Sequence, residues 1–464
     1  MRFLISILFG ALLCADTATA QDGPLDPRFG DGGMRNYGFQ SYNGSGRSDR
    51  AAAACPGPNG TLLVVGEASD ASRIVTVRLL PNGDYDSSFG AGGRATLELP
   101  MTQEPNMAGL CQPDGKIVLA RRIRVDPNDV NSETNIQLLR IHAHDGQLDT
   151  TFGQNGLSLL DLDAWQSGLS RREDPYALMP LDRGEVLLLG QVGVASDMRG
   201  FAALIGADGS VPRARVYNDV VGWPAIETLM TAAPASDGTI WAIAEGNYPR
   251  IGRISPFRMR LQRETLDRID MPDPVQNENY EIYAGVGMRV RDDVLAVPML
   301  VKNASSRPTS YSPALGIYRA GGKVILWLPR PQYYGERLSL ARALAQQHVT
   351  LLPGNRVFYA ATLARAGSGS YGVHTGLVEI GAAIGQDRID NSLGLGGEQS
   401  VSFLPVGGSC TRTLVSQWLA GVTTWAGLPV FVGAVDMTCT DPAVRNDYLV
   451  GRVLVDRIFV DGFR

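Results

Sequence analysis

Leu-Pro-Asn-Gly-Asp-Tyr-Asp-Ser-Ser-Phe-Gly-Ala-Gly-Gly-Arg-Ala-Thr-Leu-Glu-Leu, residues 80–99 of this 464-residue chain, contains two turns and the start of a strand. Its central part, residues 86–93, recurs in an earlier copy at residues 26–33 and in a later copy at residues 149–156. We call these three copies the signature turns. Their central phenylalanines are 60 and 63 residues apart. Similarity at a fixed long period indicates an array of like structural units.

The signature turns combine three residue types with separate physical roles. Glycine after the phenylalanine permits positive φ, so the chain can reverse tightly without a Cβ clash. The lone phenylalanine is expected to bury the turn against its own sheet, and the aspartate three positions earlier can accept hydrogen bonds from backbone N–H groups. We interpret nine residues as structural, in preference to a phosphate or metal site: Asp26, Phe29, Gly30, Asp86, Phe89, Gly90, Asp149, Phe152 and Gly153.

Short apolar segments that follow a turn recur along the whole chain and predict strands. Seven of them lie at residues 60–66, 115–120, 184–190, 238–243, 293–297, 355–360 and 428–433. A second apolar segment follows each, at residues 74–79, 136–141, 201–205, 251–254, 315–319, 376–380 and 448–455. One full repeat predicts four strands, at residues 94–99, 107–111, 116–120 and 136–141.

The two ends of the chain complement each other. The C-terminal Gly-Arg-Val-Leu at residues 451–454 resembles Val-Arg-Leu-Leu at residues 77–80, and the first signature turn is the segment that should follow such a strand. Joining the ends would therefore complete one repeat and remove exposed end units. We predict an all-β fold, a seven-bladed β-propeller with four-stranded blades, closed by pairing of the N- and C-terminal strands.

The repeat carries a family resemblance. Pro-Asp-Gly-Lys-Ile-Val-Leu at residues 113–119, Leu-Arg-Ile at 139–141 and Asp-Gly-Gln-Leu-Asp-Thr-Thr-Phe-Gly-Gln-Asn-Gly at 145–156 resemble the delta-60 repeat. The three matching copies cover about the first third of the chain, and residues 142–144 depart from the pattern by lengthening one turn. The resemblance implies β-propeller blades in an exported bacterial protein and implies no reaction.

The N-terminal residues have the pattern of a secretory signal peptide. Arg2 precedes an apolar run at residues 3–14, and Ala-Thr-Ala at residues 18–20 is a small-residue cleavage site. A lipoprotein signal at Cys14 is disfavoured because Leu13 precedes it. We predict a signal peptide at residues 1–20, a propeller at 21–457, a short tail at 458–464 and an extracellular or periplasmic location.

Four cysteines remain after removal of the signal peptide, and an even number in an exported protein suggests two disulfides. Cys410 and Cys439 lie symmetrically about residues 424–425, so an antiparallel hairpin there would bring the two sulfurs together. Cys55 and Cys111 would then pair by elimination.

The composition excludes several classes of protein. Hydrophobic residues make up 44% of the chain and charged residues 19%, which is typical of a globular protein. The net charge of −5 and the absence of a basic run argue against nucleic-acid binding. No segment is long and apolar enough to predict a transmembrane helix.

Few motifs suggest chemistry, and we predict no cofactor, no metal and no catalytic residue. Residues 367–372 fit the pattern G-x-G-x-x-G, but they fall between two predicted strands and not in a βαβ unit. His142 and His144 are two positions apart, so on a strand they would share a face and could bind a metal. No third ligand lies at a diagnostic spacing from them. The acidic residues Asp161, Asp163 and Asp293 are interpreted as turn or strand-end residues. Residues 336–347 are compatible with a helix or a strand.

The sequence leaves two functions open. The first is an exported, non-enzymatic binding or scaffold propeller whose partner is an unknown protein or glycan at the cell envelope or outside the cell. The alternative is a hydrolase or lyase that acts on a polysaccharide at the mouth of the propeller, where such folds accommodate ligands.

Overall fold

The computed structural model describes residues 25–453 with internal gaps. The gaps are residues 31, 38–49, 69–72, 100–106, 130, 167–171, 195–196, 218–225, 249–252, 271–272, 275–279, 292, 304–309, 320–321, 328–332, 335–346, 365–370, 391–397, 403–416 and 437–445. The predicted signal peptide and tail, residues 336–346 and most of the G-x-G-x-x-G segment therefore lie outside the described residues.

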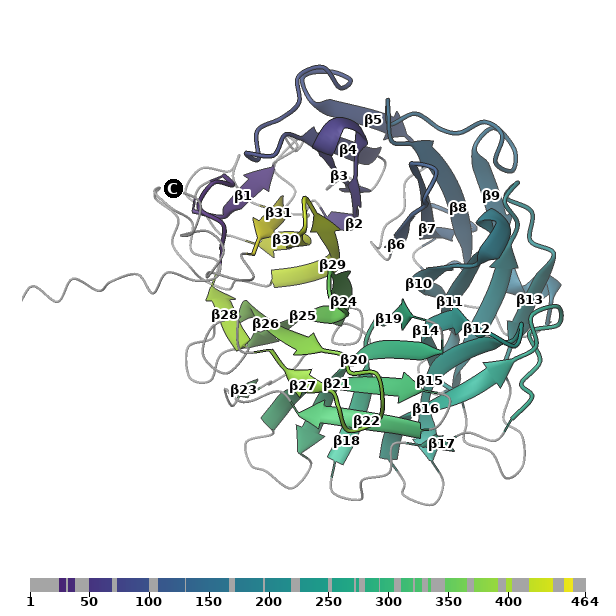
Figure 1. The fold of residues 1–464 in the computed structure, drawn as a ribbon. Coiled ribbons are helices and arrows are strands. Elements are labelled where there is room, and N and C mark those ends of the chain that lie inside the picture. The colour runs from purple at the N-terminus through teal and green to yellow at the C-terminus, as the bar shows by residue number, and fades with distance from the viewer. Residues whose placement is uncertain are drawn as a thin grey trace, which may run out of the picture.

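The described strands form seven antiparallel sheets, arranged around a common centre (Figure 1). Sheet 1 contains β2 (Arg50–Pro56), β3 (Leu62–Glu67), β4 (Arg73–Leu79) and β5 (Arg94–Glu98). Sheet 2 contains β6 (Met107–Cys111), β7 (Lys116–Arg124), β8 (Thr134–His142) and β9 (Leu157–Leu160). Sheet 3 contains β10 (Glu173–Pro180), β11 (Val186–Val194), β12 (Asp197–Ile205) and β13 (Arg213–Val216). Sheet 4 contains β14 (Thr228–Pro234), β15 (Ile240–Tyr248), β16 (Arg253–Leu261) and β17 (Asp273–Pro274).

The remaining sheets vary this plan. Sheet 5 contains β18 (Tyr280–Ala284), β19 (Met288–Arg291), β20 (Val294–Asn303), β21 (Ser310–Arg319), β22 (Gly322–Trp327) and β23 (Tyr333–Tyr334). Sheet 6 contains β24 (Gln347–Leu352), β25 (Arg356–Ala364), β26 (Tyr371–Glu379), β27 (Arg388–Ile389) and β28 (Glu398–Ser402). Sheet 7 contains β29 (Gln417–Trp425), β30 (Leu428–Asp436), β31 (Asn446–Arg452) and β1 (Met34–Tyr37). Short 3₁₀ turns occur at η2 (Pro58–Gly60), η3 (Leu162–Ala164) and η4 (Asp182–Gly184).

The chain is thus an all-β propeller with four-stranded antiparallel blades as its basic unit, as the repeat predicted. All seven turn-led segments are the second strands of their sheets, and each is followed by a third strand. Two details differ from prediction. β16 runs from Arg253 to Leu261, whereas the sequence predicted a strand only at residues 251–254. The strand predicted at 94–99 closes the sheet that precedes it, so the sequence repeat is offset from the sheet by one strand.

The two ends of the described chain meet in sheet 7. β1 pairs antiparallel with β31, with Met34 opposite Gly451 and Tyr37 opposite Tyr448. The Asp26 N–H donates to the Arg452 carbonyl at 2.8 Å, extending the contact beyond the strand. In Figure 1 the purple β1 lies beside the yellow β31.

The inner wall of the ring is formed mainly by the first strands of the sheets, and in sheet 5 by β19. β2 contacts β29 and β6, β10 contacts β6 and β14, and β24 contacts β19 and β29. Several of these inner strands carry a one-residue bulge, at Ala52, Tyr176, Met230 and Ala420. A bulge increases local twist and redirects a side chain, so these four residues interrupt the regular alternation of the inner wall.

The cysteine predictions have separate outcomes. Cys55 at the end of β2 and Cys111 at the end of β6 form a disulfide that joins the inner strands of sheets 1 and 2. Cys410 and Cys439 lie outside the described residues. The hairpin predicted between them does form, but Ala426 and Gly427 make its turn, both with positive φ, slightly later than predicted. No helix in the described residues is long and apolar enough to cross a membrane.

Candidate functional site

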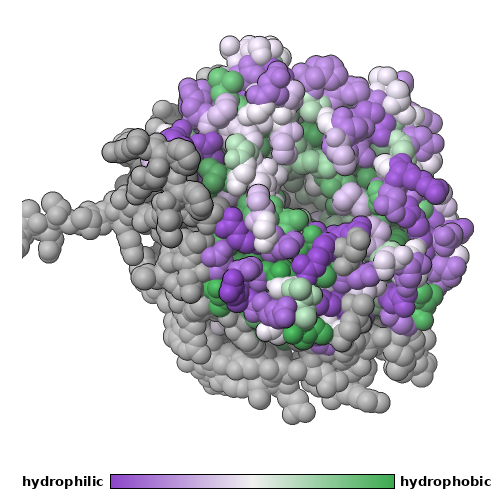
Figure 2. All heavy atoms as spheres, in the orientation of Figure 1, coloured by the Kyte–Doolittle hydropathy of each residue, from purple (hydrophilic) through white to green (hydrophobic). Residues whose placement is uncertain are grey.

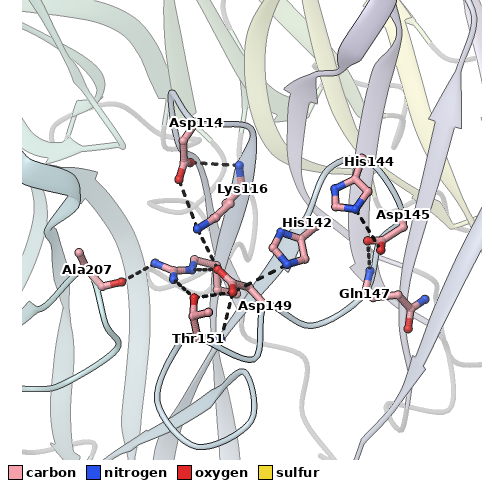
Figure 3. Close-up of polar contacts among 10 residues, drawn as sticks. Asp114, Lys116, His142, His144, Asp145, Gln147, Asp149, Thr151 and Ala207 are labelled. Carbon is pink, nitrogen blue, oxygen red and sulfur yellow. Dashed lines mark hydrogen bonds and ion pairs between the residues drawn. The ribbon is translucent and has the colours of Figure 1, made fainter.

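The third signature turn is held by an ion pair and a ring contact. Arg140 on β8 donates from Nε to Oδ2 of Asp149 at 2.7 Å, and its guanidinium lies 4.8 Å from the centre of the Phe152 ring. The same guanidinium donates to the Ala207 carbonyl in sheet 3 at 2.5 Å (Figure 3). One arginine therefore fixes the turn of its own sheet and attaches it to the next sheet.

The other two signature turns repeat this arrangement. Arg78 pairs with Asp86 at 2.8 Å, lies 4.7 Å from the Phe89 ring centre and donates to the His144 carbonyl at 3.2 Å. The third set has the same order and joins sheet 7 to sheet 1: Arg452, Asp26 and Phe29, with the Pro81 carbonyl as acceptor. All nine residues that we interpreted as structural lie in these turns, away from the central cavity described below.

Asp149 is an ionised structural group. Burial alone would raise its pKa, but hydrogen bonds from Thr151 and Lys116 and the charge of Arg140 outweigh burial and hold the pKa well below its usual range. The Thr151 N–H and hydroxyl donate to Oδ1 at 3.1 and 2.6 Å, and Lys116 Nζ lies 3.0 Å from Oδ2. A carboxylate held by this many donors is a poor base.

The two neighbouring histidines point to different carboxylates (Figure 3). His142 Nε2 lies 3.8 Å from Asp149 Oδ1, and His144 Nε2 lies 3.2 Å from Asp145 Oδ2. Across the described residues, no group of three histidine, cysteine, aspartate or glutamate side chains is placed to hold a metal ion.

A cavity of about 360 Å³ lies between the inner strands. Figure 2 shows a hollow at the centre of the ring. We call it the central cavity, and strands from six sheets supply its walls. The lining residues are mostly small or apolar: Ala52–Ala54, Met107–Cys111, Tyr176–Leu178, Val286–Met288, His348–Thr350 and Gly421–Thr423.

Two titratable side chains stand out on this wall. Tyr176 is the bulged residue of β10, and His348 lies on β24. Among the described lining residues these are the groups able to exchange a proton, because Cys111 is in the disulfide. Burial, followed by the charge of Asp174, raises the pKa of Tyr176 well above its usual range. The Tyr176 hydroxyl therefore keeps its proton at neutral pH.

A charged cluster adjoins Tyr176. Asp174 is fully buried and pairs with Arg122 on β7 and, at 2.6 Å, with Arg172. The charges of Asp174, Arg172 and Arg122 all act on the Tyr176 hydroxyl. The guanidinium groups of Arg122 and Arg172 thus both contact the Asp174 carboxylate.

Glu245 also acts on the Tyr176 hydroxyl but does not line the cavity. It is 2% exposed and accepts a hydrogen bond from the Ala284 N–H. Burial raises its pKa to about 8, so this carboxyl is largely protonated at neutral pH. It therefore carries little negative charge at neutral pH.

Glu173, the residue before Asp174, faces away from the cavity toward sheet 2. Its Oε1 accepts from the Leu162 N–H at 2.8 Å, while Oε2 has no hydrogen-bond partner within the described part of the chain. Burial raises its pKa to about 8, and the charges of Asp161 and Asp163 act in the same direction. The Glu173 carboxyl is therefore a buried structural group that does not line the central cavity.

Sequence reasoning did not single out Tyr176 or His348. The two residues are 172 positions apart and meet the same cavity because sheets 3 and 6 contribute to one ring. A bulge at residue 176 has no residue signature in the sequence, so no local pattern could have marked this tyrosine. Asp293, interpreted as a turn residue, accepts from the Ser236 N–H at 3.0 Å in the neighbouring sheet's turn.

Comparisons with known proteins describe the type of fold. Residues 57–89 and 112–152 match the family described as "Domain of unknown function (DUF5122) beta-propeller". No curated protein matches the chain significantly.

Solved structures that are similar to the chain include several enzymes of polysaccharides. Polysaccharide lyase Uly1 has 11% identity, a TM-score of 0.45, and alignment over 90% of this chain and 92% of its own. The GH93 α-L-arabinofuranosidase of Fusarium graminearum has 11% identity, a TM-score of 0.44, and coverage of 75% and 92%. An endo-arabinase from Bacteroides thetaiotaomicron has 10% identity, a TM-score of 0.34, and coverage of 60% and 95%. Similarity this remote says nothing about the reaction of this chain, whose partial family match indicates a β-propeller.

Proposed function

We propose that this protein binds a polysaccharide at the central cavity and cleaves it as a hydrolase or a lyase. The observation that carries the proposal is that Tyr176 and His348, from opposite parts of the ring, both line the central cavity. A cavity with a few convergent polar groups and perturbed pKa values is the general form of an active site. Arg122 and Arg172, both paired with Asp174, add charged groups beside Tyr176.

An exposed aromatic side chain supports a sugar as the ligand. Trp165 is 40% exposed in the segment between β9 and β10, directly after η3. The Leu162 N–H of η3 is bonded to the Glu173 carboxyl at the start of β10, on the side of that strand that faces sheet 2. An indole combines a flat apolar face with one polar edge, which suits the apolar faces and hydroxyl rim of a sugar ring.

The test is direct measurement of turnover. The purified protein is incubated with arabinan, polygalacturonate, alginate and hyaluronan, and new chain ends are counted by reducing-sugar assay and mass spectrometry. The proposal predicts release of fragments from at least one polymer, with loss of turnover in Tyr176→Phe. Absence of any fragment, together with no retardation in affinity gels containing the four polymers, would refute it.

A second candidate is a binding or scaffold propeller without turnover. It is favoured by the contacts of the two buried carboxyl groups near Tyr176, since Asp174 is held by two arginines and Glu245 by a backbone N–H. This function predicts retention of one polymer or protein partner with no product. Binding with no product after prolonged incubation would decide in its favour.

We also propose that the seven sheets are seven blades of a closed ring, and that the signature turns are delta-60 repeats. The antiparallel register of β1 with β31 and the contacts between successive inner strands support closure. The shared Arg-Asp-Phe contacts of three successive sheets support a common repeat.

Export by a signal peptide at residues 1–20, with the propeller at 21–457 and a tail at 458–464, is part of the same proposal. The Cys55–Cys111 disulfide supports it, because disulfides persist in oxidising compartments. N-terminal sequencing of the protein recovered from periplasm or medium tests cleavage before Gln21. A protein that retains Met1 there would contradict it.

A further inference from the structure

We infer that Asn59 is a site of spontaneous deamidation in the folded protein, and that its conversion to isoaspartate loosens a contact between sheet 1 and sheet 7. The modification goes beyond the proposed function, because it needs no ligand and no catalytic group. It starts from the Asn-Gly pairs of the sequence, since glycine has no Cβ to hinder attack by its backbone nitrogen on the preceding side chain.

The reaction balances with water as its one co-reactant. The backbone nitrogen of Gly60 loses its proton to solvent and attacks Cγ of Asn59, so a new N–C bond forms. The carboxamide C–N bond breaks, and the leaving nitrogen takes up a proton and departs as ammonia. Water then opens the resulting cyclic imide at either carbonyl and restores the Gly60 N–H. The products are aspartate with a normal backbone and isoaspartate, in which the main chain runs through the side chain.

Three Asn-Gly pairs lie in described turns: Asn59–Gly60, Asn82–Gly83 and Asn155–Gly156. A fourth pair, at residues 43–44, lies outside the described residues. Closure of the cyclic imide requires the glycine nitrogen to leave its native position and approach the asparagine side chain. Local structure should therefore decide which pair reacts.

Two of the pairs are protected by packing. Gly83 and Gly156 are buried, and their N–H groups donate to backbone carbonyls at 2.8 Å. An added Cβ would lie 3.0 Å from a neighbouring side chain at Gly83 and 2.7 Å from one at Gly156, so neither backbone has room to move. The Asn82 carboxamide is also held by Asp84, to which its Nδ2 donates at 2.7 Å.

The remaining pair has neither form of protection. Pro58, Asn59 and Gly60 form η2 between β2 and β3, and all three are exposed. An added Cβ on Gly60 would meet no atom within 4 Å, so the backbone can move here without a clash. Asn59 has φ of 57° and ψ of 32°, a left-handed conformation that interrupts the helical turn. A short exposed turn of this kind opens locally at small cost.

A change at Asn59 would reach the contact between two sheets. The Gly60 carbonyl accepts a hydrogen bond at 2.9 Å from Nε1 of Trp425, which is buried at the end of β29 in sheet 7. The Trp425 ring lies 5.9 Å from the Phe29 ring, edge to face, and 5.3 Å from the Arg452 guanidinium. Isoaspartate adds one methylene to the main chain directly before Gly60 and so displaces this carbonyl. Normal aspartate leaves the main chain unchanged.

The experiment ages the purified full-length protein for several weeks in mildly alkaline buffer, with and without denaturing urea. Peptide mapping by mass spectrometry measures conversion of amide to acid at each pair, and isoaspartate methyltransferase labels the rearranged product. In the folded protein we expect Asn59 to react severalfold faster than Asn82 and Asn155. In urea the three pairs should react at similar rates, because packing no longer distinguishes them. Asn59→Gln should lose the fast reaction and keep the slow ones.

Two outcomes would overturn the site. Equal rates at the three pairs in the folded protein would show that structure does not select Asn59. Reaction of Asn59 in urea but not in the folded protein would show that the turn protects it.

The effect on the contact between sheets is tested separately. The isoaspartate form, isolated by ion exchange, should unfold at a lower urea concentration than the variant Asn59→Asp, which has the same charge on an unaltered main chain. Equal unfolding midpoints would refute the loosening of the Trp425 contact.

Discussion

Arg140 and Asp149 form an almost completely buried ion pair, with 2.7 Å between Nε and Oδ2 and side-chain exposures of 6% and 2%. The arginine reaches the Ala207 carbonyl of the next sheet, and its face lies over Phe152. The pair therefore links two sheets through one cation. The same arrangement recurs with Arg78 and Asp86 and with Arg452 and Asp26.

Loss of the Asp149 carboxylate should destabilise the protein strongly. In Asp149→Ala the buried Arg140 charge loses its partner, which typically costs about 3 kcal/mol or more. Urea unfolding followed by tryptophan fluorescence measures the change. Asp126→Ala is the control, because the Asp126 carboxylate is exposed and accepts the Asn128 N–H, and this change should alter stability by less than about 1 kcal/mol. Equal effects of both variants would contradict the role of the pair.

Gly209 lies in the turn that follows β12 in sheet 3. A glycine should be needed there for two reasons: its backbone has a positive φ, and the signature turn of sheet 2 packs closely against it. Gly209 and Gly238 share φ of +83°, but a Cβ on Gly209 would lie 2.6 Å from the Gly153 backbone nitrogen and 2.9 Å from the Phe152 ring, whereas Gly238 has no atom within 4 Å. Gly238→Ala should cost about 1 to 2 kcal/mol for the left-handed backbone alone. Gly209→Ala should cost clearly more in the same urea experiment. A smaller effect at Gly209 would show that the close approach of this turn to Gly153 and Phe152 is dispensable.

The Cys55–Cys111 disulfide should contribute to stability, because it ties two inner strands that are 56 residues apart in sequence. Removal of such a bridge costs typically about 2 to 5 kcal/mol. Thermal unfolding with and without dithiothreitol measures it. The double variant Cys55→Ser/Cys111→Ser should resemble the reduced protein, and dithiothreitol should then leave its unfolding temperature unchanged apart from any effect on other cysteines.

Glu173 should make stability depend on pH. Burial, with the charges of Asp161 and Asp163, raises its pKa from 4.5 to about 8 in the folded protein. Folding therefore favours the protonated carboxyl, and this contribution is complete below about pH 4.5 and is lost as the pH rises toward 8.

In Glu173→Gln no carboxyl group can ionise at this position, so the loss of stability with rising pH should disappear. The variant should therefore gain stability relative to wild type between pH 5 and about 8. Urea unfolding at a series of pH values provides the comparison. Glu264→Gln, at an exposed glutamate, is the control and should leave the pH profile as it is in the wild type. An unchanged profile in Glu173→Gln would show that another group governs the pH dependence.

Local sequence was sufficient for the second and third strands of each sheet and for the signature turns. The second and third strands of each sheet occur where apolar runs follow glycine-rich turns, since backbone conformation and burial at these places depend on neighbouring residues. The signature turns likewise carry their own aspartate, phenylalanine and glycine residues. Even the pairing of β1 with β31 could be inferred, because the two ends complement each other within one repeat.

Tertiary structure alone decided the candidate site. Tyr176 and His348 belong to strands without a shared motif, and only the circular arrangement of the sheets brings both to one cavity. The charged surroundings of Tyr176 come from β7 and β10, so the electrostatic environment also depends on packing between sheets. Proton-transfer chemistry depends on distances and burial across the fold, and neither quantity is encoded in any short stretch of the chain.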